Sequence, residues 1–178
     1  MSIPIELMDQ NPWWRKPEDI LQDRRIVTLS KSSVCWVPRI KQTFDLDTDA
    51  VYTLRGPRQV GKTTLLKDMI RDLINQNVSP RNIFYFTCDL IDNPKALADT
   101  ITSYLEMVRP DKTQRAYLLI DEVSSVKDWQ KAIKFLADKD SLIQTTLILT
   151  GSHTLDIKKA SEKLPGRRGE AKDLLDKI

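Results

Sequence analysis

The sequence alternates two apolar patterns from residue 50 onward. Short runs of consecutive apolar, β-branched and aromatic residues predict buried strands at residues 51–54, 83–88, 116–120 and 146–149. Between and after these runs, apolar residues recur every three or four positions, which predicts helices over residues 65–77, 97–108, 129–136 and 155–163. Strands that alternate with helices indicate an α/β fold with a mainly parallel sheet.

Polar residues predict where two of these helices begin. Asn93 stands before Pro94, a helix cap followed by a first-turn proline. Ser124 and Ser125 stand before the helix that carries Trp129, and we expect them to cap it.

The first 49 residues lack the alternation of strands and helices. Their Asn-Pro-Trp-Trp sequence at residues 11–14 indicates an extended or turning segment, residues 18–25 a short helix, and residues 34–37 an edge strand. Trp13 and Trp14 would form either an exposed partner-binding patch or, as we expect, a contact that packs this segment on the rest of the chain. We therefore predict an N-terminal arm, residues 1–49, and a domain, residues 50–178.

The clearest chemical motif lies between the first predicted strand and its helix. Residues 54–64 read LRGPRQVGKTT and contain the phosphate-binding pattern GxxxxGK[ST]. Backbone N–H groups in such a loop point inward at phosphate oxygens, and glycine allows their close approach. Lys62 would supply charge to the β- and γ-phosphates, and the Thr63 hydroxyl would ligate Mg²⁺. The expected nucleotide-binding residues are Gly56, Pro57, Arg58, Gln59, Val60, Gly61, Lys62, Thr63 and Thr64.

An ordinary glycine turn with a surface lysine would explain the same letters. The order of strand, loop and helix around the motif favours nucleotide binding over that alternative.

Two carboxylates follow the third predicted strand. Asp121 and Glu122 come directly after its apolar run, in the arrangement of a Walker B element. Asp121 would hold Mg²⁺ through water, and Glu122 would polarise the attacking water. The alternative is an ordinary acidic helix start after a core strand.

Further candidates follow the fourth predicted strand. Thr150 and Ser152 could contact the γ-phosphate or the lytic water, although Ser152 could equally cap the next helix. Arg167 and Arg168 lie in a glycine-flanked segment and could reach phosphate, in cis or across an interface, as an arginine finger. A solvated basic loop is the alternative for these arginines.

Composition excludes several functional classes. The chain has 178 residues, of which 40% are hydrophobic and 30% charged, as in an ordinary globular domain. Because His153 is the one histidine, a histidine-based metal cluster or a Ser-His-Asp triad is implausible. Cys35 and Cys88, the two cysteines, lie in apolar runs, so we expect buried reduced thiols.

Charge and hydropathy give weaker information about partners and location. The net charge of +3 does not by itself favour nucleic acid, although basic residues gather near the C-terminus and leave such a partner possible. The N-terminus lacks the pattern of a signal peptide, and no apolar stretch has the length of a membrane span. We therefore expect a cytoplasmic protein that does not enter a membrane.

The order of the motifs resembles that of AAA-type P-loop ATPases of the additional-strand class. More narrowly, the chain is similar to bacterial and archaeal ATP-binding proteins whose ATPase domain precedes a DUF4143 domain. The shared motifs are NPWW at residue 11, TLRGPRQVGKTTLLK at 53, YLLIDEV at 117, LTGSHT at 149 and LPGRRGE at 164.

The resemblance implies a three-layer α/β fold that binds ATP and Mg²⁺. The family's sheet has the strand order 5-1-4-3-2, and its members continue past the GRRG segment into a fifth strand and a C-terminal domain. This chain stops at Ile178, so we expect the order 1-4-3-2, with the fifth strand missing or supplied elsewhere, and the first strand at an edge.

Three functions are compatible with these residues. The principal prediction is a Mg²⁺-dependent ATPase in which Lys62, Thr63, Asp121 and Glu122 carry the chemistry. The alternative is a module that binds ATP without turnover and docks a protein or nucleic acid. A protein partner or self-association is possible in either case. A small-molecule kinase ranks last because Glu122 suits hydrolysis and no acceptor-binding motif is visible. ATP is favoured over GTP because no NKxD-like element occurs.

Overall fold

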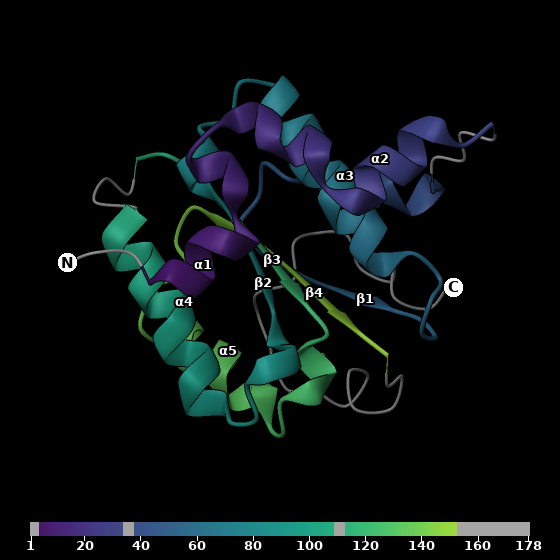
Figure 1. Cartoon of the computed structure of the whole chain (residues 1–178). Helices are drawn as coiled ribbons and strands as arrows, with labels where there is room; N and C mark the ends of the chain where they lie inside the picture. Colours follow the sequence, from purple (N-terminus) through teal and green to yellow (C-terminus); the bar gives the residue numbers. More distant parts are fainter. Residues whose placement is uncertain (1–3, 34–37, 109–112, 153–178) are drawn as a thin grey trace.

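A computed structural model describes residues 4–33, 38–108 and 113–152 of the chain (Figure 1). Its sheet contains four parallel strands: β1 (Ala50–Arg55), β2 (Ile83–Thr87), β3 (Ala116–Asp121) and β4 (Thr145–Gly151). Their spatial order is β1-β4-β3-β2, which confirms the predicted strands, the 1-4-3-2 order and the edge position of β1 among the described residues.

Helices cover both faces of the sheet and produce three layers (Figure 1). On one face lie α2 (Arg24–Lys31) and α3 (Lys62–Asn75), which contact each other. On the other face α4 (Pro94–Val108) packs against α5 (Trp129–Asp138). This arrangement confirms the expected α/β class, since parallel strands need their connecting helices on the faces of the sheet.

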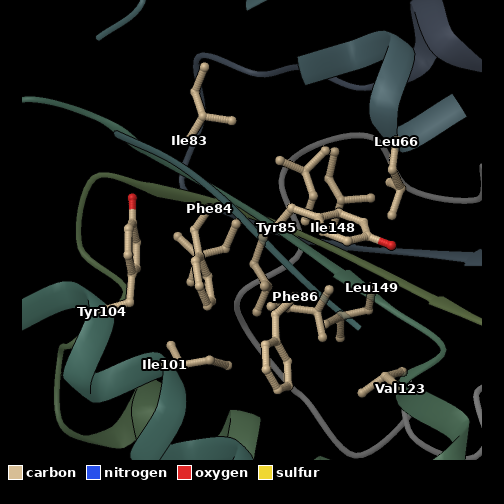
Figure 2. Packing of buried hydrophobic residues seen from close by; sticks show 14 of the residues in the cluster. Leu66, Ile83, Phe84, Tyr85, Phe86, Ile101, Tyr104, Val123, Ile148 and Leu149 are labelled. Carbon is tan, nitrogen blue, oxygen red and sulfur yellow. The ribbon is translucent and has the colours of Figure 1, made fainter. Parts of the chain in front are cut away.

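The core lies where the strands meet these helices. Alternate β2 side chains point to opposite faces: Tyr85 extends toward Leu66 of α3, whereas Phe84 and Phe86 point toward Ile101 of α4 (Figure 2). Leu66 and Ile101 are completely buried, as their positions on apolar helix faces predict.

Residues 4–14 cover the outer edge of β2. They form the short helix α1 (Ile5–Gln10) and one 3₁₀ turn (Pro12–Trp14). Trp13 and Trp14 are buried, and the indole N–H of each donates to the Ile83 carbonyl, at 3.1 and 2.8 Å. The tryptophans therefore pack on the sheet and form no exposed patch.

Two amide side chains complete the cover of this edge. The Asn11 amide donates to the Tyr85 carbonyl at 2.8 Å and accepts from the Tyr85 N–H at 2.7 Å. Gln10 accepts from the Thr87 N–H at 2.9 Å. Because an edge strand otherwise presents unpaired backbone groups, these side chains replace a neighbouring strand.

Two local predictions about helices are wrong. Residues 18–25 form no single helix: a 3₁₀ helix (Pro17–Gln22) ends first, and α2 begins at Arg24, where the Asp23 carboxylate accepts from the Arg25 N–H. Ser124 and Ser125 do not cap α5, because Val123–Ser125 forms its own 3₁₀ turn and α5 starts after Asp128.

The cap predicted for α4 is confirmed. The Asn93 side chain accepts a hydrogen bond from the Ala96 N–H at 2.9 Å. The predicted strand at residues 34–37, the predicted helix at residues 155–163 and Cys35 lie outside the described residues.

Candidate functional site

The phosphate-binding motif forms the turn between β1 and α3. Gly61, the residue before α3, has a φ angle of +91°, in the left-handed region that glycine adopts without strain. A Cβ atom on Gly56 would lie 3.3 Å from Cγ2 of Val60, so the loop is also tight at its start. The loop thus ends at a helix N-terminus, which is a favourable position for an anion.

Lys62 folds into this loop. Its ammonium donates to the carbonyls of Gly56 and Pro57, at 2.9 Å each, and its side chain is buried. Two of its three N–H donors are therefore used by the backbone. The same ammonium lies 3.9 Å from Oε1 of Glu122, so the lysine links the loop with the end of β3.

Asp121 is the centre of a buried hydrogen-bond network. Its Oδ2 accepts from the Thr63 hydroxyl at 2.6 Å and from the Tyr85 hydroxyl at 3.1 Å. Its Oδ1 accepts from the Thr150 hydroxyl and, at 3.2 Å, from the Glu122 N–H. These four donors come from separate parts of the sequence and compensate the burial of the carboxylate.

The strand order explains why these residues meet. β4 lies between β1 and β3, so Thr150 near its end lies between the loop after β1 and Asp121 at the end of β3. The carboxyl ends of parallel strands form one edge of the sheet, where ligands of open α/β folds bind. The structure brings together Lys62, Thr63, Asp121, Glu122 and Thr150.

Glu122 occupies an unusual backbone conformation. Its φ angle is +51°, in the left-handed region, which costs energy for a residue with a Cβ atom. Two contacts support the turn: the Ser125 hydroxyl lies 2.8 Å from the Glu122 carbonyl, and the Glu122 N–H lies 3.1 Å from Oγ1 of Thr150. The Glu122 side chain is 27% exposed, so it remains accessible beside the buried Asp121.

The residues predicted after β3 and Glu122 lie at different distances from Asp121 or outside the described residues. Thr150 is fully buried, with its hydroxyl on Asp121. Ser152 lies directly after β4, and its N–H donates to the Ser124 hydroxyl at 3.1 Å. Arg167 and Arg168 lie outside the described residues.

A cleft of about 930 Å³ adjoins the loop. Its lining includes the buried Leu65 and Met69 of α3 and, from the segment before β1, Ile40. An ion-pair cluster borders it, in which Lys41 contacts Asp68 and lies 2.6 Å from Asp72. Both apolar and charged side chains therefore line the cleft, and Lys62 is among them.

Sequence reasoning missed Tyr85. Burial and the negative charge of Asp121 raise the pKa of the Tyr85 hydroxyl, which favours the protonated form that donates a hydrogen bond. The signal that could have found it is the register of β2 against β3. Thr87 of β2 pairs with Asp121 of β3, and Tyr85, two residues before Thr87, lies on the same face of the sheet as this pair.

Cys88 is buried and makes no disulfide, as expected. Burial, followed by the charges of Asp121 and Asp89, raises the pKa of its thiol well above the usual range. The raised pKa favours the protonated thiol.

Other site types find no support in the described ranges. Within residues 4–33, 38–108 and 113–152, no three histidine, cysteine or acidic side chains form a metal-binding group. No helix in those same ranges is long and apolar enough to cross a membrane.

The fold, the loop and the acidic strand end define a nucleotide-binding P-loop protein. A family model described as an AAA domain matches residues 48–174. The chain therefore belongs to this AAA domain family, which confirms the AAA-type P-loop assignment.

Two curated relatives are similar to parts of the chain. An uncharacterized protein of Haemophilus influenzae is 28% identical over 108 residues, which cover 60% of this chain and 26% of that protein. An uncharacterized protein of Methanocaldococcus jannaschii is 26% identical over 126 residues, which cover 70% of this chain and 26% of that protein. The aligned part thus spans about a quarter of each relative.

Solved structures resemble the chain more distantly. The structure of C. elegans PCH-2 has a TM-score of 0.46 and 20% identity, and the alignment covers 86% of this chain and 40% of PCH-2. A RuvB mutant of Thermotoga maritima has a TM-score of 0.43 and 18% identity, with coverage of 85% and 43%.

Proposed function

We propose that the chain binds ATP with Mg²⁺ and hydrolyses the bond between its β- and γ-phosphates. The observation that carries the proposal is the contact between Thr63 and Asp121. The hydroxyl of Thr63 lies 2.6 Å from Oδ2 of Asp121, at the N-terminus of α3 and beside Lys62. One hydroxyl and one carboxylate beside a phosphate loop are the donors that Mg²⁺ uses in nucleotide sites.

These residues fit a hard cation well. Thr63 and Asp121 offer oxygen atoms only, and nucleotide phosphates and water would complete the set. Held by Thr63 and Asp121, Mg²⁺ would supply positive charge that offsets the negative charge of the nucleotide phosphates.

The loop and Lys62 would bind the phosphates. Lys62 has one N–H donor that neither the Gly56 nor the Pro57 carbonyl uses. Backbone N–H groups at the start of α3 would add further donors, and the helix dipole would favour the negative charge. We propose ATP as the nucleotide because the sequence contains no guanine-specific element.

The nucleoside would occupy the cleft beside the loop. Leu65, Met69 and Ile40 provide apolar surface for the faces of a base. The cleft, of about 930 Å³, is within the range of small-molecule sites.

Glu122 is proposed to orient the attacking water. Its carboxylate is accessible and lies 3.9 Å from the Lys62 ammonium, so it is close to the expected phosphates. Water would donate a hydrogen bond to Glu122 while its oxygen attacks the γ-phosphorus in line, and the bond to the ADP oxygen breaks. Thr150 would act indirectly, because its hydroxyl holds Asp121.

A turnover measurement tests this role. We expect Glu122→Gln to lower the rate of phosphate release about 100-fold or more, because it removes the carboxylate that orients water. ATP affinity should change little. The control is Glu106→Gln, which removes an exposed carboxylate on α4. Retained turnover in Glu122→Gln would refute the role of Glu122.

The second candidate is a module that binds ATP without turnover. The length of the curated relatives favours this candidate. The part aligned with this chain spans 26% of each relative, which leaves room for catalytic groups in the remainder. The same experiment separates the candidates: ATP binding by the wild-type chain with no turnover above that of Glu122→Gln would support the second.

A further inference from the structure

Tyr85 contacts the proposed metal carboxylate directly, yet no step of the proposed chemistry uses it. Its hydroxyl donates to Oδ2 of Asp121 at 3.1 Å, the oxygen that also accepts from Thr63. The tyrosine is 6% exposed and points toward α3, away from the aromatic residues Phe84 and Phe86 (Figure 2). A buried hydroxyl of this kind fixes the orientation of the carboxylate that it contacts.

The backbone of Tyr85 is held from outside the sheet. Asn11, completely buried, binds both the N–H and the carbonyl of Tyr85, at 2.7 and 2.8 Å. Its amide donates a second hydrogen bond to the Leu7 carbonyl at 2.8 Å. The residue that contacts Asp121 is therefore anchored to a segment 74 positions away in the sequence.

The ring of Tyr85 is held from the side of α3. The Lys67 ammonium lies 3.5 Å from its centroid and 4.9 Å from the centroid of Trp13. Asp23, the residue before α2, lies 3.7 Å from the same ammonium. A cation over an aromatic face is attractive, so Lys67 restrains the plane of the ring and with it the direction of the hydroxyl.

We propose that Tyr85 is a positioning residue for the metal-binding carboxylate, and that Asn11 and Lys67 hold Tyr85 in place for this purpose. The inference rests on the proposed binding of ATP and Mg²⁺. It assigns to the N-terminal arm a part in setting the metal requirement of the nucleotide site.

A purely structural tyrosine would behave differently. If Tyr85 only filled the core, loss of its hydroxyl would lower stability and leave the response to Mg²⁺ unchanged. If it positions Asp121, the same loss would raise the Mg²⁺ concentration needed for tight ATP binding. Affinity for metal-free ATP would then stay the same, since the Tyr85 hydroxyl donates to Asp121, whereas the loop amides and Lys62 would bind the phosphates.

The test compares Tyr85→Phe with Tyr104→Phe in the whole chain. Phenylalanine keeps the ring that faces Lys67 and removes only the hydroxyl. The control loses an equivalent buried hydroxyl, which donates to the Arg81 carbonyl at 2.9 Å, away from Asp121. ATP affinity is measured by calorimetric titration in EDTA and over a series of Mg²⁺ concentrations.

We expect Tyr85→Phe to raise the half-saturating Mg²⁺ concentration about tenfold, as loss of a group that orients a metal ligand commonly does. Its affinity for ATP in EDTA should remain within about twofold of wild type, a change too small to indicate a lost contact. Tyr104→Phe should match wild type in both measurements. An unchanged Mg²⁺ requirement in Tyr85→Phe would overturn the inference.

The outcomes separate this inference from the function on which it rests. Wild-type protein that binds no ATP in either condition would refute the proposed function, and the inference with it. Wild-type protein that binds ATP equally well with and without Mg²⁺, and still hydrolyses it in a Mg²⁺-dependent way, would overturn the inference alone. If Tyr85→Phe does not fold, Lys67→Met provides the same readout: a raised Mg²⁺ requirement supports the inference, and a wild-type requirement overturns it.

Discussion

The two outer strands of the sheet have different surroundings. Side chains from residues 10–14 satisfy the outer backbone groups of β2 at Ile83, Tyr85 and Thr87. β1, at the opposite edge, has β4 as its one strand neighbour among the described residues, and it leads into the phosphate-binding loop. One edge is thus closed by the arm, whereas the other carries the proposed nucleotide site.

The comparison shows how both edges of a small sheet can hold one carboxylate in place. The closed edge restrains β2, and β2 contacts Asp121 through Tyr85. The loop after β1 contacts Asp121 through Thr63. Besides the hydrogen bonds from Thr150 and Glu122, Asp121 therefore receives one from β2 and one from the loop after β1, and changes at either edge should act on it separately.

The largest expected effect comes from opening the closed edge with Asn11→Ala. The change leaves the buried N–H and carbonyl of Tyr85 without partners, and each such group costs about 1 to 3 kcal/mol. We expect a loss of about 2 to 6 kcal/mol in the free energy of unfolding, measured by urea denaturation. As a control, Asn82→Ala removes an exposed contact with Gln114 and should cost less than about 0.5 kcal/mol. Equal losses in the two variants would contradict the edge-closing role.

A second effect concerns the charge enclosed between the arm and α3. Burial lowers the pKa of Lys67 from 10.5 to about 8, although Asp23 partly offsets this. Below about pH 8 both folded and unfolded states bind the proton. Between about pH 8 and 10.5 the unfolded state binds more protons, so the free energy of unfolding should rise with pH relative to Lys67→Met.

Across this pH range, the free energy of unfolding of wild type should rise by about 3 kcal/mol relative to that of Lys67→Met. It would be measured as the wild-type value minus the Lys67→Met value in denaturation series at several pH values. Lys131→Met, which changes an exposed lysine, should keep the wild-type pH dependence. A pH-independent difference between wild type and Lys67→Met would show that the buried ammonium is not destabilised.

A smaller effect is expected at the opposite edge of the sheet, where β1 leads into the phosphate-binding loop; we call this the open edge. Gly61→Ala places a Cβ on a residue with a φ of +91°, although no atom lies within 4 Å of that position. The cost therefore comes from backbone strain alone, about 1 to 2 kcal/mol in the free energy of unfolding. Gly56→Ala, where φ is not in the left-handed region, tests instead the 3.3 Å contact with Val60. Thermal denaturation that shows no loss in Gly61→Ala would argue against the described loop conformation.

Local sequence was sufficient to predict the open edge. The strand, the loop motif and the helix are contiguous, so their spacing alone indicates the turn that holds Gly61 and Lys62. Asp121 was predictable because a buried parallel strand delivers its last residue to the same edge of the sheet.

The closed edge was not predictable in this way. Asn11 and Tyr85 are 74 positions apart, and no periodicity in the sequence relates a loop amide to an edge strand. The prediction that Ser124 and Ser125 cap α5 was wrong for a similar reason. The Ser125 hydroxyl donates to the carbonyl of Cys88, which lies in another loop, so a tertiary contact overrides the local signal.

The most direct test of the account is an equilibrium titration of the chain with ATP in the presence of Mg²⁺, for wild type, Lys62→Ala and Lys131→Ala. We predict saturable binding by wild type and by Lys131→Ala, and about 10- to 100-fold weaker binding by Lys62→Ala, which loses a charged hydrogen-bond donor to phosphate. Equal ATP affinity in wild type and Lys62→Ala would contradict the account.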